Sequence, residues 1–165
     1  MKKIAAPEID WQKFYDAVSK MTVRIPIPGD GEIVAPVVLE QLLAKVQSRR
    51  QKVDDHSRRI LMILGNLKAQ LSVAEHDLRV ARSVYASDPQ VVGSVRGEKQ
   101  KAAIVETLVM TEHQKISRIR ALIAQYDTAL SALKMTVETF DRAKETLNAM
   151  HRGAIAELTG RGNVR

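Results

Sequence analysis

The chain has 165 residues, of which 45% are hydrophobic and 27% charged, so it can bury a core and is too apolar for a disordered protein. It contains no cysteine, which excludes a disulfide framework, a zinc–thiolate site and a thiol nucleophile. Its net charge of +7 favours an anionic partner such as nucleic acid.

Residues 1–35 differ from the rest in residue pattern. They predict a short helix followed by an extended arm. The stretch PEIDWQKFYDAVSKM (7–21) spaces Trp11, Phe14 and Tyr15 as a helix would. The next stretch, TVRIPIPGDGEIV, has prolines that exclude a central strand and a turn signal at PGDG. The aromatic residues either cap the long helices that follow or form a docking surface or base-stacking platform.

Two long helices dominate the remainder. The first is predicted over 36–86, between Pro36 and the stop signal SDP. The second runs without a glycine or proline from Glu98 to Arg152, and its pattern continues to Leu158. With a turn near 87–96, they should fold back as one antiparallel hairpin over 36–158, followed by a flexible tail at 159–165.

Both helices repeat apolar residues at alternating steps of four and three, the 3.5-residue period of a coiled-coil seam. Polar residues interrupt this seam at Arg50 and Ser57 in the first helix and at Glu112, Lys144 and His151 in the second. The predicted seam residues are Leu39, Leu43, Val46, Val53, Ile60, Leu64, Leu67, Leu71, Ala74, Leu78, Ala81 and Tyr85, then Val105, Val109, Ile116, Ile119, Ile123, Tyr126, Leu130, Leu133, Val137, Phe140 and Leu147.

The two flanks of the seam differ. One flank is polar in both helices, and it includes Glu75, Arg82, Glu106, Arg120 and Asp141. The other flank is apolar, and in an antiparallel pair like flanks meet, so the hairpin should carry a second apolar edge. A short helix can hide only part of it, which favours a homo-oligomer. The residues expected at this interface are Leu42, Ile63, Val84, Leu108, Leu122 and Met150.

The sequence carries no enzymatic motif. Four histidines are dispersed outside any HExxH or ExxH arrangement, and phosphate-loop, GxGxxG and GxSxG motifs are absent. Carboxylates lie beside basic residues, where helical pairing explains them. Glu112 and His151 sit on the seam, where polar residues usually set register. We therefore expect no enzyme, no cofactor and no metal site.

Positive charge is the remaining feature of the sequence that indicates a function. The first long helix has nine basic residues against five acidic ones, and Lys45, Lys52 and Arg59 recur every seven residues along one face. Such a stripe can follow a phosphate backbone without reading bases, or it is an ordinary solvated face. The residues predicted to contact phosphates are Lys45, Arg49, Lys52, Arg58 and Arg59.

From about Arg82 onward the layout resembles the UvsY-type recombination mediators of T-even-like phages. The resemblance lies in ARSVYASDPQVV, in the EK-initiated helix that follows, and in ETLNAMHRGAIAEL near the end. It implies a helical protein that binds single-stranded DNA, forms ring-like oligomers and helps load a recombinase onto strands covered by single-strand-binding protein. By position it implies DNA contacts at Arg82, Arg96, Lys99, Lys101 and Arg152.

Together these patterns predict an all-α, oligomeric helical hairpin that binds single-stranded nucleic acid, as a phage-type recombination mediator does. The alternative is a structural coiled-coil component of a phage particle or other protein assembly, without nucleic-acid contact. The start MKKIAAPEIDW lacks the apolar run of a secretory signal, and no stretch is long enough to span a membrane. We expect a cytoplasmic protein, or a virus-encoded one in the host cytoplasm or a virion.

Overall fold

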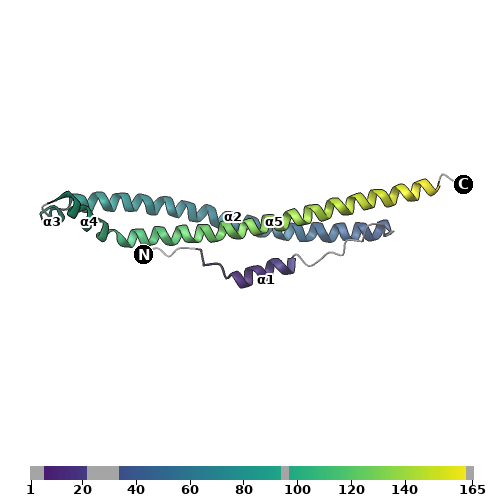
Figure 1. The fold of residues 1–165 in the computed structure, drawn as a ribbon, viewed down its shortest axis with the longest axis horizontal. Coiled ribbons are helices and arrows are strands. Elements are labelled where there is room, and N and C mark those ends of the chain that lie inside the picture. Colours follow the sequence, from purple (N-terminus) through teal and green to yellow (C-terminus); the bar gives the residue numbers. More distant parts are fainter. Residues whose placement is uncertain (1–5, 22–33, 94–96, 163–165) are drawn as a thin grey trace. The chain divides into compact units, whose positions relative to one another are not determined.

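The structure, a computed structural model, describes residues 6–21, 34–93 and 97–162, where every regular element is a helix (Figure 1). In chain order the helices are α1 (Trp11–Met21), α2 (Pro36–Ser87), α3 (Pro89–Gly93), α4 (Glu98–Leu108) and α5 (Met110–Gly162). Helices α2 and α5 pack against each other as a hairpin. This confirms the predicted all-α class, the helical hairpin and the short N-terminal helix. Most of the predicted extended arm, residues 22–33, lies outside the described residues.

Helix α1 begins four residues later than predicted because Asp10 caps it. The Asp10 side chain accepts a hydrogen bond from the Lys13 backbone N–H (3.1 Å), which satisfies one of the free donors of the first turn. None of the α1 residues is buried. Trp11 stacks on Tyr15 and meets Phe14 edge-on, with ring centroids 5.7 Å apart in both pairs.

The turn between the long helices contains the short helix α3. The Asp88 side chain accepts a hydrogen bond from the Gln90 backbone N–H (2.8 Å), so the acidic residue of the predicted stop signal also starts α3. Helix α3 contacts α4, which begins after Gly97.

The second long helix was predicted to be unbroken, and this prediction was wrong at one residue. Val109 separates α4 from α5, with a ψ of 11° in place of the helical value of about −42°. The interruption follows a stretch rich in β-branched residues, which form helices less readily. In addition, the Thr107 hydroxyl donates to the Ala103 carbonyl oxygen (2.9 Å), a local bond that favours bending. At its other end α5 continues to Gly162, beyond the predicted limit at 158.

The chain divides into two compact units, each containing a stretch of α2 beside a stretch of α5 (Figure 1). Unit 1 comprises Met1–Glu8 and Leu61–Thr128, and unit 2 comprises Ile9–Ile60 and Ala129–Arg165. In unit 1 the Tyr126 hydroxyl donates a hydrogen bond to the Pro7 carbonyl oxygen (3.0 Å), and burial raises the pKa of Tyr126. The buried hydrophobic residues of unit 1 are Leu64, Leu67, Ala74, Leu78, Val91, Val105, Val109, Ile116, Ile119, Leu122 and Tyr126.

Unit 2 has its own core. Its fully covered side chains include Leu39, Val46, Val53, Leu133 and Leu147. Most of the predicted seam is confirmed as buried in the two units. On α5, however, Ile123 and Val137 are only half-buried, and burial shifts toward their neighbours. Leu122, Ala129 and Thr136 are buried, and they lie seven residues apart. Burial on α5 therefore keeps the heptad spacing and extends to the predicted apolar flank, part of which is covered within the chain.

Candidate functional site

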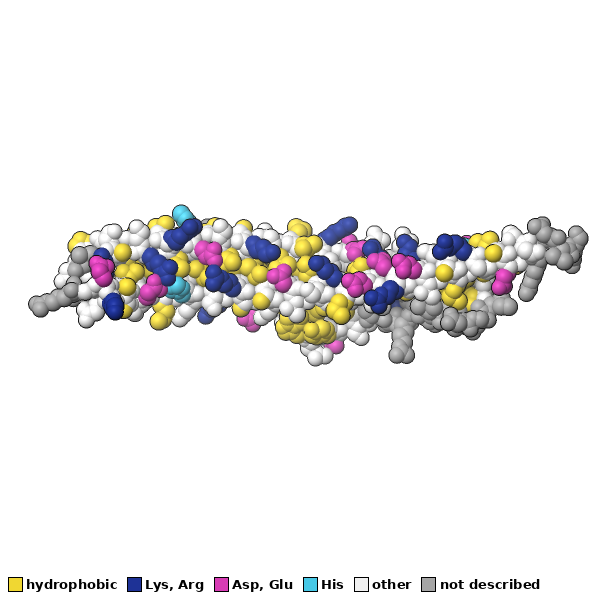
Figure 2. Space-filling view, turned by 45° about the horizontal axis from the view of Figure 1, so that its top comes forward, with side chains coloured by type: hydrophobic (Ala, Val, Ile, Leu, Met, Phe, Trp, Pro, Cys, Tyr) yellow, Lys and Arg dark blue, Asp and Glu magenta, His cyan; other side chains and the backbone are white. Residues whose placement is uncertain are grey.

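A basic face of α2 in unit 2 is the strongest candidate for a ligand-binding surface. Lys45, Lys52 and Arg59 are exposed, and none of them has an ion-pair or hydrogen-bond partner in the part of the chain that the structure describes. We call these three residues the basic stripe. They lie seven residues apart, which places them about 10 Å apart along the helix. Figure 2 shows lysine and arginine side chains interleaved with acidic and hydrophobic ones on the face in view.

The two other residues predicted for this surface are less available. Arg58 is exposed but lies 3.8 Å from the carboxylate of Asp55. Arg49 is half-buried and already has an interaction partner. The predicted set of five therefore reduces to the basic stripe, with Arg58 beside it.

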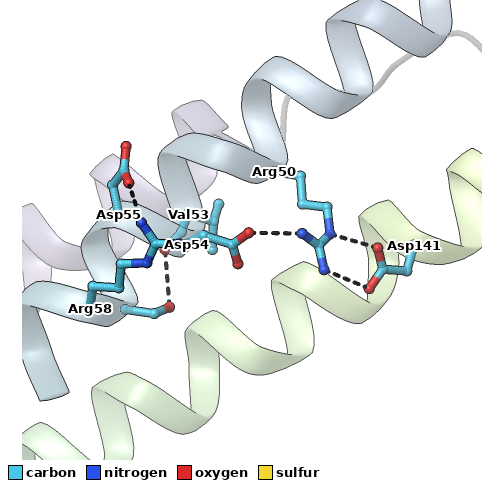
Figure 3. Close-up of polar contacts among 7 residues, drawn as sticks. Arg50, Val53, Asp54, Asp55, Arg58 and Asp141 are labelled. Carbon is cyan, nitrogen blue, oxygen red and sulfur yellow. Dashed lines mark hydrogen bonds and ion pairs between the residues drawn. The ribbon is translucent and has the colours of Figure 1, made fainter.

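Arg50, a polar exception in the predicted seam, joins α2 to α5 (Figure 3). Its Nε lies 2.7 Å from Asp141 Oδ1, and its Nη1 donates to Asp54 Oδ2 at 2.8 Å. The hydrogen bond with Asp141, followed by the charge of Asp54, raises the pKa of Arg50. This guanidinium is therefore occupied by two carboxylates and is not part of the candidate surface.

The residues implied by the resemblance are dispersed. Lys99 and Arg152 are exposed, and Lys101 is half-buried. Arg96 lies outside the described residues. Arg82 is engaged within unit 1, because its Nη2 lies 2.8 Å from Glu106 Oε1. The structure thus does not gather these five residues into one site.

Arg82 belongs to a polar network on the predicted polar flank of unit 1. His113 Nε2 lies 2.9 Å from Glu106 and 3.1 Å from Arg82 Nη2. Hydrogen bonds from Arg82, and then from His113, lower the pKa of Glu106. Nearby, Arg120 donates to Glu75 at 2.8 Å. The heptad pattern placed these residues on one flank, and the structure pairs them across the two helices.

The residues predicted for an oligomer interface fall into three groups. Leu42 and Leu122 are buried within the chain. Ile63 and Met150 are half-buried. Val84 and Leu108 are exposed, at 61% and 43%. The exposed apolar surface extends well beyond this set. On α2 it includes six further residues that lie off the predicted seam, namely Val37, Val38, Leu61, Met62, Val73 and Val80.

The described residues give little evidence for a metal site, a buried polar site or a membrane span. Within residues 6–21, 34–93 and 97–162, no group of three or more histidines and carboxylates is placed to hold a metal ion. The buried Glu112 Oε2 has no hydrogen-bond partner in those ranges, and His151 lies 3.4 Å from the Glu40 carboxylate. Each described helix is too short or too polar to span a lipid bilayer.

The described chain is therefore an all-α helical hairpin with an exposed basic stripe in unit 2 and exposed apolar residues in both units. No protein family, curated protein or solved structure matches the chain.

Proposed function

We propose that this protein is a non-enzymatic, oligomeric helical protein that binds single-stranded nucleic acid through the basic stripe. The observation that carries the proposal is the combination of exposure and regular spacing at Lys45, Lys52 and Arg59, together with the lack of an acidic partner for them among the described residues. Cations without partners can displace the counterions condensed on a phosphate backbone. The resemblance to UvsY-type mediators makes a phage-type recombination mediator, with a recombinase as protein partner, the specific form of this proposal.

The stripe should bind the backbone without reading bases. Lysine and arginine side chains at intervals of about 10 Å along a helix suit contacts with phosphates. No aromatic residue is interleaved with them in the sequence to stack on bases. Affinity should therefore be similar for different base sequences and should fall steeply with salt.

The salt dependence provides the first test. For single strands the slope of log affinity against log salt is about −0.7 per phosphate neutralised, so three contacts per protomer predict a slope near −2. The variant Lys45→Glu/Lys52→Glu/Arg59→Glu should bind a fluorescent oligonucleotide far more weakly, with a slope close to zero. The measurement is fluorescence anisotropy over a range of salt concentrations.

A matched control distinguishes the effect of the basic stripe on affinity from the effect of net charge. The variant Lys68→Glu/Arg79→Glu/Arg118→Glu also lowers the net charge of +7 by six, at three exposed residues of unit 1. It should keep most of the wild-type affinity and slope. Equal losses in both variants, or no wild-type binding at low salt, would contradict the proposal.

The alternative function, a structural component of a protein assembly, is favoured by the exposed apolar residues of α2 and α5. It predicts a defined oligomer whose mass does not change when single-stranded oligonucleotide is added.

A further inference from the structure

Unit 1 contains a groove that residues of both α2 and α5 line. The groove has a volume of about 420 Å³, within the range of about 300–1,000 Å³ that is usual for small-molecule sites. Its two apolar lining residues, Leu78 of α2 and Ile116 of α5, are both buried. Its polar lining consists of Glu75, Arg79, Arg82, His113 and Arg120.

Positive charge exceeds negative charge among these lining residues and the carboxylate that pairs with them. Arg120 donates to Glu75 at 2.8 Å, and Arg82 lies 2.8 Å from Glu106. Arg79 is exposed and has no ion-pair or hydrogen-bond partner within the described ranges. Three arginines thus face two carboxylates, which leaves the charge of Arg79 without an anion.

His113 adds a further hydrogen-bond donor to the groove. The ionised Glu106 carboxylate only accepts, so His113 Nε2, which lies 2.9 Å from it, must carry the proton that it donates. Arg82 Nη2 lies 3.1 Å from the same nitrogen, and because arginine has no acceptor these two donors cannot bond to each other. Arg82 Nε is buried and finds no acceptor among the described residues. Donors therefore outnumber acceptors around Arg82.

We propose that this groove binds a phosphate dianion, either inorganic phosphate or the phosphate group of a small phosphomonoester. Such a group carries a charge of about −1.5 to −2 at neutral pH and supplies acceptor oxygens that the chain itself lacks here. The planar guanidinium of Arg79 suits a phosphate, which it can bind with two parallel hydrogen bonds.

The inference does not rest on the proposed nucleic-acid binding. The basic stripe belongs to unit 2, whereas the groove belongs to unit 1. The internal phosphates of a nucleic-acid strand carry one negative charge each, so they match the groove less well than a dianion does.

Isothermal titration calorimetry with inorganic phosphate at low ionic strength tests the proposal. Wild type should bind phosphate but not chloride at equal ionic strength. Arg79→Gln should weaken the binding by about tenfold or more, because it removes charge-assisted hydrogen bonds to the ligand. Its circular dichroism should match wild type, since Arg79 is exposed.

A matched control distinguishes the groove from the charge of unit 1 as a whole. Arg118→Gln removes the same charge from an exposed arginine of unit 1 that does not line the groove. This variant should bind phosphate like wild type. Equal weakening in the two variants, equal binding by wild type and Arg79→Gln, or no wild-type binding at millimolar phosphate would overturn the proposal.

Two further titrations identify the source of the phosphate and separate the two proposals. A nucleoside 5′-monophosphate that binds more tightly than inorganic phosphate assigns the groove to an organic phosphate, whereas equal affinities assign it to the phosphate group alone. A nucleoside that binds as tightly as its monophosphate would contradict phosphate recognition. The variant Lys45→Glu/Lys52→Glu/Arg59→Glu should keep its phosphate binding even if it loses the oligonucleotide, since its changes lie in unit 2.

Discussion

Arg50 stands at a position of α2 where the heptad pattern predicts an apolar side chain. It stays partly exposed, at 37%, and binds one carboxylate on its own helix and one on α5. A charged residue at a seam position is tolerated only in registers that supply its partners, so it specifies the register more than it adds stability. Ser57, the other exception in α2, satisfies its hydroxyl locally by donating to the Val53 carbonyl oxygen.

Glu106 should make the stability of unit 1 depend on pH in the acidic range. Its pKa is lowered in the folded protein, chiefly by Arg82, so its ion pair stabilises fully above the unfolded glutamate value of about 4.5. That contribution is lost as the pH falls through the lower, folded pKa. Glu106→Gln should therefore melt below wild type at neutral pH, by a small margin because the pair is exposed.

The difference between wild type and Glu106→Gln should shrink as the pH falls below 4.5, as measured by thermal melts across pH. Glu145→Gln is a suitable control, because Glu145 is exposed and makes no ion pair with the described residues. A melting difference for Glu106→Gln that is independent of pH would argue against the Arg82–Glu106 interaction as its cause.

At the scale of helices, most of the architecture could be predicted from the sequence. Pro36 and the SDP stop signal act within one or two turns of chain, so they place the ends of α2 to within a residue. The interruption at Val109 could not be predicted, since it involves no glycine or proline. The burial of Leu122 in preference to Ile123 was also missed, because heptad spacing alone does not decide which flank of the seam the neighbouring helix covers.

Gly65 lies inside α2 at an exposed position, and a Cβ added there would meet no atom within 4 Å. Gly65→Ala should therefore stabilise the protein by about 1 kcal/mol through helix propensity alone. For a chain of this size that corresponds to a rise in melting temperature of about 2–4 °C. Thermal melts followed by circular dichroism provide the measurement.

Two other glycines provide comparisons for the stabilisation predicted for Gly65→Ala. Gly153 lies inside α5 with equally open surroundings, so Gly153→Ala should give a similar rise. Gly97 is the N-cap of α4, where glycine is preferred over alanine, so Gly97→Ala should give no rise. A gain at Gly97 equal to that at Gly65 would mean that helix propensity is not the cause.

At the scale of the whole molecule, the proposed nucleic-acid surface belongs to one of the two units. The basic stripe lies in unit 2. Sequence periodicity identified the basic stripe, since charges seven residues apart share a face whatever covers the helix. It did not identify the exposed apolar residues of α2 in unit 1, because Met62 and Val73 fall outside the heptad seam. It also could not show that Arg82 is engaged by Glu106, a residue 24 positions away.

Because each unit has its own core, a core truncation should loosen the unit in which it lies. Leu67 in unit 1 and Leu133 in unit 2 are both fully covered. Replacing either with alanine should cost about 2–5 kcal/mol by leaving a cavity. Hydrogen exchange measured by mass spectrometry should then show the largest loss of protection in 61–128 for Leu67→Ala and in 36–60 and 129–162 for Leu133→Ala.

Met135→Ala controls for the loss of a large side chain, since Met135 lies two residues beyond Leu133 and is 70% exposed. Methionine and alanine both favour helix, so this variant should exchange like wild type. Sub-global opening requires that the free energy of exposing one core be smaller than that of exposing both. If Leu67→Ala and Leu133→Ala instead lose protection equally over all described helices, the two cores unfold together, and the continuous α2 and α5 transmit the loss of either one.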